Sequence, residues 1–185
     1  MKRIMALILA AVMIFSMTAC GGEKTYTKDD LAIRDIDSGK LIRIGDSRED
    51  IEKIVGEPEG VEEEADGELV YNYSDNMEVT YNESGEVICV HCFNYRKEEN
   101  KYELAEGVGF GQTQEDFFNA YPGAENRWGG MMDSFVVRKR EDSKKYKLYT
   151  EVLDDPEATD SIAIYVFYDT NLKIGSFEIV TYKYE

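Results

Sequence analysis

The chain has 185 residues, of which 38 are acidic and 21 basic, so its net charge is −17 at pH 7. A surface this acidic repels phosphate backbones, and we therefore expect no nucleic acid among the partners. His91 is the only possible histidine base for nucleophilic catalysis, and together with Cys89 and Cys92 it supplies three of the four ligands that a zinc site needs. We accordingly expect no enzymatic activity, no catalytic or metal-binding residue and no cofactor.

The first nineteen residues have the pattern of an export signal. Two basic residues precede an apolar run, 4–17, that is too short to span a membrane. The run leads into Met17-Thr18-Ala19-Cys20, which resembles the lipobox of bacterial lipoproteins, in which the cysteine thiol takes a diacylglyceryl group and becomes the new N-terminus. This resemblance implies that residues 1–19 are removed and that Cys20 attaches the protein to a bacterial membrane outside the cytoplasm, on the cell surface or in the periplasm. The alternative is an ordinary secretory signal followed by a chance cysteine.

Residues 20–39 are expected to form a tether between the lipid and the fold, because 23–30 is polar and lacks periodic apolar residues. The segment 35–39, Asp-Ile-Asp-Ser-Gly, resembles the opening of a calcium-binding loop. Its glycine comes one place too early and no glutamate closes the loop, so we predict a turn there.

One short stretch occurs twice in the chain. The sequence Ile-Gly-Asp-Ser-Arg-Glu-Asp-Ile at 44–51 returns at 110–117 as Phe-Gly-Gln-Thr-Gln-Glu-Asp-Phe. Ser47 and Thr113 are predicted N-caps, and Asp50 and Asp116, three residues on, complete a shorter form of the capping box. These signals predict helices at 47–55 and 113–121. Because capping accounts for the four polar residues, we interpret them as structural.

Alternating apolar and polar residues predict antiparallel strands after each helix. The predicted strands are 69–73, 77–81, 86–93, 134–140, 146–153, 161–168 and 174–182. The segment 162–168 is apolar on both faces and is expected in the middle of a sheet. The expected fold class is therefore α+β. It would consist of two tandem repeats, 40–95 and 103–185, each a helix followed by an antiparallel meander, with the helices packed on one face of the sheet or sheets.

Two cysteines, Cys89 and Cys92, flank Val90 and His91 in a predicted strand. In an extended strand, residues three apart lie about 10 Å apart and on opposite faces, whereas a disulfide needs Cα atoms within about 7 Å. We therefore predict two buried strand cysteines without a bridge, and we place His91 on the same face as Cys89.

A basic segment stands out against the acidic background. It comprises Arg138, Lys139, Arg140, Lys144, Lys145 and Lys147. One interpretation is a solvated hairpin tip, and the other is a docking patch for an acidic partner or an anionic membrane surface. Trp128, in a loop rich in Gly and Met, is a further candidate for partner binding, because tryptophan often anchors protein interfaces.

The two units, with Gly-x-Ser/Thr-x-x-Asp-Ile/Phe opening each helix, resemble the β-lactamase inhibitory protein-like superfamily over residues 40–183. A single unit of this kind also occurs in small lipoproteins of the outer-membrane β-barrel assembly machinery. The second helix of each unit in those families is not evident here and no inhibitory loop can be matched, so no functional residue is carried over. The resemblance implies a non-enzymatic protein-binding module, inhibitory or assembly-related, on a membrane-anchored extracytoplasmic lipoprotein. The alternative is a lipoprotein that binds a small molecule, a wall fragment or a cation.

Overall fold

The structure is a computed structural model and describes residues 24–64, 67–73, 76–94, 100–127, 130–139, 145–148 and 160–182. The expected signal peptide and Cys20 lie outside these residues. Within the described ranges, no helix has the length and apolar character needed to cross a bilayer.

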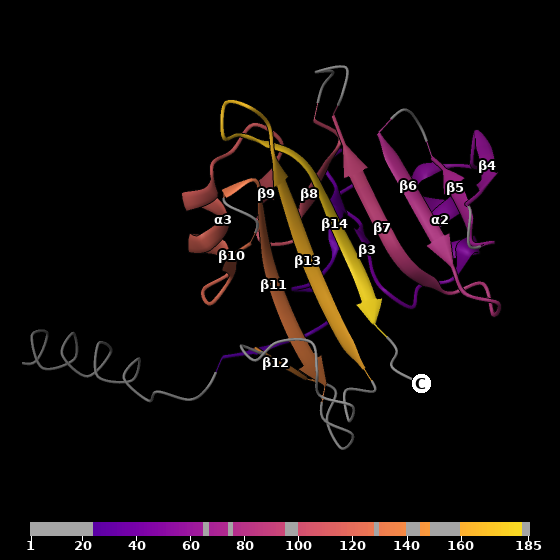
Figure 1. The fold of residues 1–185 in the computed structure, drawn as a ribbon. Helices are drawn as coiled ribbons and strands as arrows, with labels where there is room; N and C mark the ends of the chain where they lie inside the picture. Colours follow the sequence, from indigo (N-terminus) through magenta and orange to yellow (C-terminus); the bar gives the residue numbers. More distant parts are fainter. Residues whose placement is uncertain are drawn as a thin grey trace, which may run out of the picture.

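Two antiparallel sheets form the described part of the chain (Figure 1). The large sheet has ten strands, in the order β1 (Thr25–Tyr26), β12 (Tyr146–Leu148), β11 (Met132–Lys139), β13 (Ser161–Tyr168), β14 (Ile174–Tyr182), β7 (Val87–Phe93), β6 (Met77–Tyr81), β5 (Leu69–Asn72) and β4 (Gly60–Glu63), with β10 (Glu125–Arg127) paired to β11. The second sheet has the order β3 (Leu41–Ile42), β2 (Ile33–Asp35), β8 (Tyr102–Leu104) and β9 (Val108–Gly109).

The expected α+β fold class, with helix-packed tandem repeats, is wrong. The described residues are mostly β, and their two helices, α2 (Arg48–Val55) and α3 (Gln114–Ala120), are eight and seven residues long. Each helix has one fully buried residue, Ile51 or Phe117, so the helices contribute little of the core. The strands of both expected repeats instead join in one continuous sheet through the pairing of β7 with β14.

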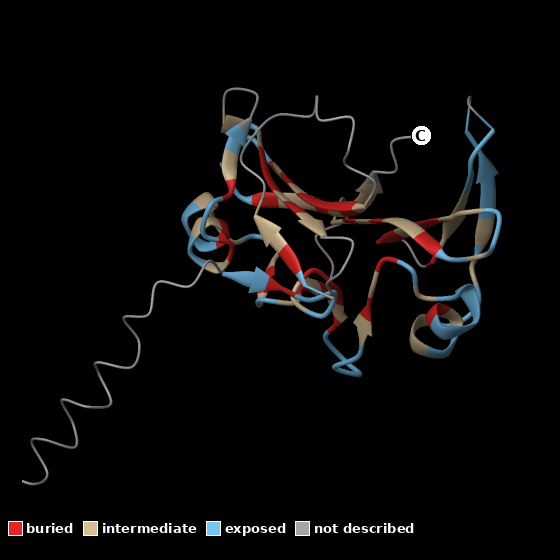
Figure 2. Ribbon diagram, turned by 90° about the horizontal axis from the view of Figure 1, so that it is seen from below, coloured by how far each residue is buried: buried red, intermediate tan, exposed pale blue. Residues whose placement is uncertain are grey.

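The large sheet has a covered face and a partly exposed one. Both helices and the second sheet lie on the same side of it (Figure 2). We call this side the inner face; its buried residues include Val79, Val90, Phe135, Ile164 and Ile179. Burying each such side chain contributes about 1.5–3 kcal/mol relative to leaving it exposed. The outer face, on the opposite side, carries half-buried residues, namely Glu78, Cys89, His91, Phe93, Val136, Tyr165, Phe167, Glu178 and Val180.

Residues 24–39 belong to the fold and do not form the tether that was expected at 20–39. β1 pairs with β12, and β2 lies between β3 and β8. Tyr26 is 1% exposed and meets Phe135 edge to face, with ring centroids 5.0 Å apart. Leu31 and Ile33 are buried as well. These apolar residues are too few to form a recognisable period, so the sequence does not predict strands here. They are buried because β1 and β2 pair with strands that are distant in the sequence.

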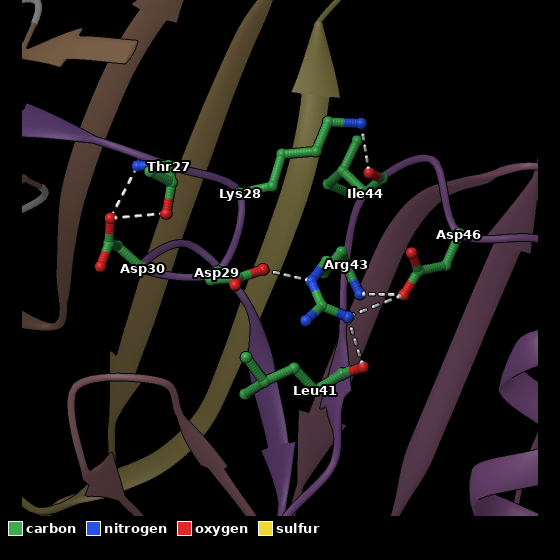
Figure 3. A network of polar contacts seen from close by, with 8 residues as sticks. All are labelled: Thr27, Lys28, Asp29, Asp30, Leu41, Arg43, Ile44 and Asp46. Atoms are coloured by element: carbon green, nitrogen blue, oxygen red, sulfur yellow. Dashed lines mark hydrogen bonds and ion pairs between the residues drawn. The ribbon is translucent and has the colours of Figure 1, made fainter. Parts of the chain in front are cut away.

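Residues 27–30 hold the turn at 43–46 that leads into α2 (Figure 3). The Lys28 ammonium donates to the carbonyl of Ile44 at 2.8 Å, and the Arg43 Nε donates to Asp29 at 2.5 Å. Gly45 in this turn has a φ of +85°, and a Cβ added to it would lie 2.7 Å from the Lys28 Nζ. The turn therefore favours glycine for its backbone conformation and for the close approach of Lys28.

Candidate functional site

Two junctions, where a turn enters a helix, dock on the large sheet through matching hydrogen bonds. We call residues 44–47 with 82–88 the first junction, and residues 110–113 with 169–175 the second. The bonds are Gly45 N to Val87 O (2.8 Å) and Val87 N to Asp46 O (2.9 Å) in the first, and Gly111 N to Ile174 O (2.9 Å) and Ile174 N to Gln112 O (2.9 Å) in the second. Isolated bridges pair Ser47 with Glu86 and Thr113 with Lys173.

Each junction also contains a β-bulge at the same place relative to the turn. In the first, Thr80 pairs with Cys89 and Tyr81 with Val87, which leaves Ile88 as the extra residue. In the second, Phe167 pairs with Ser176 and Tyr168 with Ile174, which leaves Gly175 as the extra residue. Bulges redirect side chains and are common beside functional sites.

A groove of about 630 Å³ opens at the second junction. It is lined by Asn94, Asn100, Phe110, Gly111, Phe167, Tyr168, Asp169, Lys173, Ile174, Gly175 and Ser176. The Asn94 amide donates to the Asn100 side-chain oxygen at 3.2 Å, and the Asn100 amide donates to the carbonyl of Phe110 at 3.3 Å. A smaller recess of about 120 Å³ also touches Asn100 and Phe110. The groove thus combines aromatic rings with two carboxamides.

A buried carboxylate lies next to this groove. Asp133 is completely buried and accepts hydrogen bonds from Tyr168 (2.5 Å), Asn126 (2.9 Å) and Gln114 (3.0 and 3.1 Å). Burial, followed by the bond to Asp133, raises the pKa of Tyr168. Because its donors are neutral groups from α3, β10 and β13, the carboxylate links these elements, and we interpret it as structural.

On the outer face, the single histidine lies between two carboxylates. His91 is the strand partner of Glu78 on one side and of Glu178 on the other. The His91 Nδ1 is 3.5 Å from a Glu78 carboxylate oxygen, and its ring lies 5.4 Å from the ring of Phe93. Burial raises the pKa of Glu178, and the nearby His91 partly offsets this. Among the described residues, no group of three or more His, Cys, Asp and Glu could hold a metal ion.

The two strand cysteines are free thiols, as predicted, but only Cys92 is buried as expected. Cys92 faces the core and is completely buried, whereas Cys89 is half-buried on the outer face, which it shares with His91. Burial raises the pKa of both thiols. Since the thiolate is the reactive form, neither cysteine is suited to nucleophilic chemistry.

The caps expected at both helix starts are present. The Ser47 hydroxyl accepts the N–H of Asp50 at 3.2 Å. Thr113 and Asp116 form a reciprocal capping box, in which the Thr113 N–H donates to the Asp116 carboxylate at 2.8 Å. Side-chain hydrogen bonds, from Ser47 to Asp50 and from Thr113 to Asp116, lower the pKa of each aspartate.

The structure describes part of the expected basic patch. Lys139 pairs with Asp160 at 3.5 Å, Arg138 is the strand partner of Lys147, and Lys145 is exposed. Arg140, Lys144, Trp128 and the lipid-attachment candidate Cys20 lie outside the described residues. Because an acidic side chain already neutralises Lys139, the described part of this patch gives little support for docking an acidic partner.

Sequence reasoning did not find the groove. Its lining comes from separate segments of the chain. Phe110 and Gly111 belong to the repeated stretch, whose signal is for a helix start, and Gly175 is an isolated glycine in a predicted strand. An isolated glycine in a predicted strand indicates a bulge or a close approach.

No protein-family model matches the chain. No curated protein matches it either. Among solved structures, the chain is similar to a cysteine-rich secretory protein from Staphylococcus aureus subsp. aureus Mu50, with a TM-score of 0.38 and 16% identity over 74% of this chain. The match covers 44% of that protein, so the chain spans less than half of its length. A likeness at this TM-score carries no argument, and the resemblance to the β-lactamase inhibitory protein-like superfamily stays a prediction.

Proposed function

We propose that the protein is a membrane-anchored extracytoplasmic lipoprotein that binds another protein through the outer face and has no enzymatic activity. The observation that supports this most is a group of half-buried aromatic residues in the middle of the outer face. Phe93 and Phe167 flank Ser176 in one row of strand partners, and Tyr165 flanks Glu178 in the next. Aromatic side chains that keep part of their surface in water are typical anchors of protein interfaces.

The charges on this face indicate the chemistry of the partner. Glu78 and Glu178 lie in the same row as Tyr165, and the whole chain carries a net charge of −17. A partner surface that combines apolar and basic residues complements this arrangement, and the long-range attraction would speed its association.

Crosslinking and affinity capture from native membranes with the lipidated protein test the proposal. The double variant Phe93→Ala/Tyr165→Ala removes two of the aromatic side chains, and Val61→Ala/Leu69→Ala is the control, because Val61 and Leu69 are exposed apolar residues on β4 and β5. We expect a protein that the wild type and the control capture and the outer-face variant loses. Capture of no protein, or equal capture by all three, contradicts the proposal.

The membrane anchor needs its own test, because Cys20 lies outside the described residues. Cells supplied with a clickable fatty acid should label the wild type, and the Cys20→Ser variant should lose both the label and its place in the membrane fraction. An unlabelled wild type contradicts the anchor and leaves the test of the outer face intact.

A further inference from the structure

The two junctions have the same backbone framework but differ in what surrounds it. At the first junction, the Lys28 ammonium donates a hydrogen bond of 2.8 Å to the carbonyl of Ile44, as part of the network of residues 27–30 (Figure 3). At the second, the corresponding carbonyl, that of Phe110, accepts from the Asn100 amide at 3.3 Å. A charged side chain in one junction thus corresponds to an uncharged carboxamide in the other.

The bulge residue differs as well. It is Ile88 in the first junction and Gly175 in the second, so the second lacks a side chain at this position. A Cβ added to Gly175 would lie 3.7–3.9 Å from Asp169 and Phe167, which is ordinary van der Waals contact, and the φ of Gly175 is not in the left-handed region. The backbone therefore does not demand glycine here. What the glycine provides is space in the groove that it lines.

The described part of the groove lining is balanced in charge. Among the described lining residues, the charged side chains are Asp169 and Lys173, one of each sign. The Asp169 carboxylate is already engaged, since it accepts the backbone N–H groups of Asn171 at 2.8 Å and Lys173 at 3.0 Å. In a chain with a net charge of −17, the lining residues that the structure describes offer little to an anionic ligand and no group of carboxylates to a cation.

The remaining lining groups favour a ligand with both hydroxyl groups and an apolar surface. The carboxamides of Asn94 and Asn100 contain donors and acceptors, as does the hydroxyl of Ser176. The half-buried ring of Phe167 provides a flat apolar surface, whereas Phe110 is only 7% exposed and its ring stacks on Phe177. A volume of about 630 Å³ lies in the range of small-molecule sites, which combine apolar walls with a few polar groups.

A peptide fits this place less well than a small molecule. Peptides commonly bind by adding a strand to the free edge of a sheet. The strands at the groove, β7, β13 and β14, each have a partner on both sides, so they offer no free edge.

We propose that the groove at the second junction binds an uncharged carbohydrate, with a sugar ring against Phe167 and its hydroxyl or amide groups bonded to Asn94 and Asn100. The groove shares Phe167 with the outer-face aromatic group proposed to bind a protein, but its other lining residues are not part of that group. The inference goes beyond the proposed function, and it can be tested on the purified protein alone.

The experiment is isothermal titration of the full chain in detergent with three probes, N,N′-diacetylchitobiose, maltose and glucuronate. The variant Gly175→Val fills the groove, and Gly60→Val is the matched control. Gly60 is also a strand glycine, and a Cβ added to it would make one ordinary contact of 3.9 Å with Asn72. We expect saturable binding of at least one neutral sugar, weakened at least tenfold by Gly175→Val and unchanged by Gly60→Val.

Three results would overturn the proposal. They are no saturable binding of either neutral sugar, binding that Gly175→Val leaves unchanged, and tighter binding of glucuronate than of the neutral probes. Thermal unfolding of each variant shows whether it is folded. If Gly175→Val does not fold, Asn94→Ala takes its place, because it removes a carboxamide from the groove without adding volume.

Discussion

The phenolic hydroxyl of Tyr168 donates a hydrogen bond of 2.5 Å to Asp133, whose carboxylate is completely buried. This bond joins β13 to its neighbour β11, and the other donors to Asp133 come from α3 and β10. When a buried acceptor loses one of its donors, the folded state is destabilised, because the acceptor has left water without a full set of hydrogen bonds. We therefore expect each hydrogen bond to Asp133 to contribute measurably to the free energy of unfolding.

Tyr168→Phe removes only the hydroxyl, and we expect it to lower the free energy of unfolding by about 1–3 kcal/mol. Urea denaturation followed by circular dichroism measures this. The control is Tyr71→Phe, because the contacts of Tyr71 with Arg48 and Tyr81 use its ring, which phenylalanine keeps. Equal stability of the two variants would show that the bond to Asp133 contributes nothing.

Glu178 should make the stability depend on pH. Because burial raises its pKa in the folded state, protonation favours folding; this contribution is present below the ordinary pKa of 4.5 and is lost as pH rises through the folded pKa. Glu178→Gln should therefore raise the melting temperature relative to wild type at pH 7 and leave it nearly unchanged at pH 4. Glu83→Gln, at an exposed turn position, is the control. A variant less stable than wild type at pH 7 would contradict this role of burial.

The close approach of Lys28 to Gly45 predicts a coupling between the two residues. Gly45→Ala and Gly111→Ala both place alanine at a positive φ, but only the first meets a neighbour, the Lys28 Nζ at 2.7 Å. We expect Gly45→Ala to lower the free energy of unfolding by about 1 kcal/mol more than Gly111→Ala does, because this is the typical net contribution of the hydrogen bond that Lys28 would lose. In a Lys28→Met background this difference between the two variants should disappear, and a double-mutant cycle of unfolding free energies measures it. A difference that persists in that background would rule out Lys28 as its cause.

The two strand cysteines should resist alkylation in the folded protein. Because burial raises the pKa of Cys89 and Cys92, few thiolates form near neutral pH. Mass spectrometry of a Cys20→Ser variant treated with iodoacetamide at pH 8 should show no adduct in native buffer and two adducts in guanidinium chloride. Rapid labelling of Cys89 in native buffer would contradict this protection.

The sequence predicted the elements whose signals are local. Helix α2 begins one residue after its predicted cap, and β6 and β13 have the predicted bounds, because capping residues and alternation act within a few positions. The interior place of β13 followed from its apolar character on both faces. The short strands were missed because their stability comes from distant partners; Arg34 on β2, for example, pairs with Glu103 on β8 at 2.7 Å.

The fold class and the groove could not be predicted because both depend on contacts between segments that are distant in the sequence. Both predicted helices are present, but two helices of about two turns bury too few residues to define the fold class. The pairing of β7 with β14, which unites the large sheet, has no local sequence signal. The groove brings Asn94, Asn100 and Gly175 together from separate segments. Of these, only the glycine was unusual for its place in the sequence.

The position of β14 has a consequence for the order in which the protein can fold. β14 lies in the interior of the large sheet, between β13 and β7 (Figure 1). Because β7 and β13 are distant in the sequence and each pairs with β14, the two parts of the sheet join only when β14 has paired with both. Until that step, β7 and β13 each present an unpaired strand edge, and such edges promote aggregation.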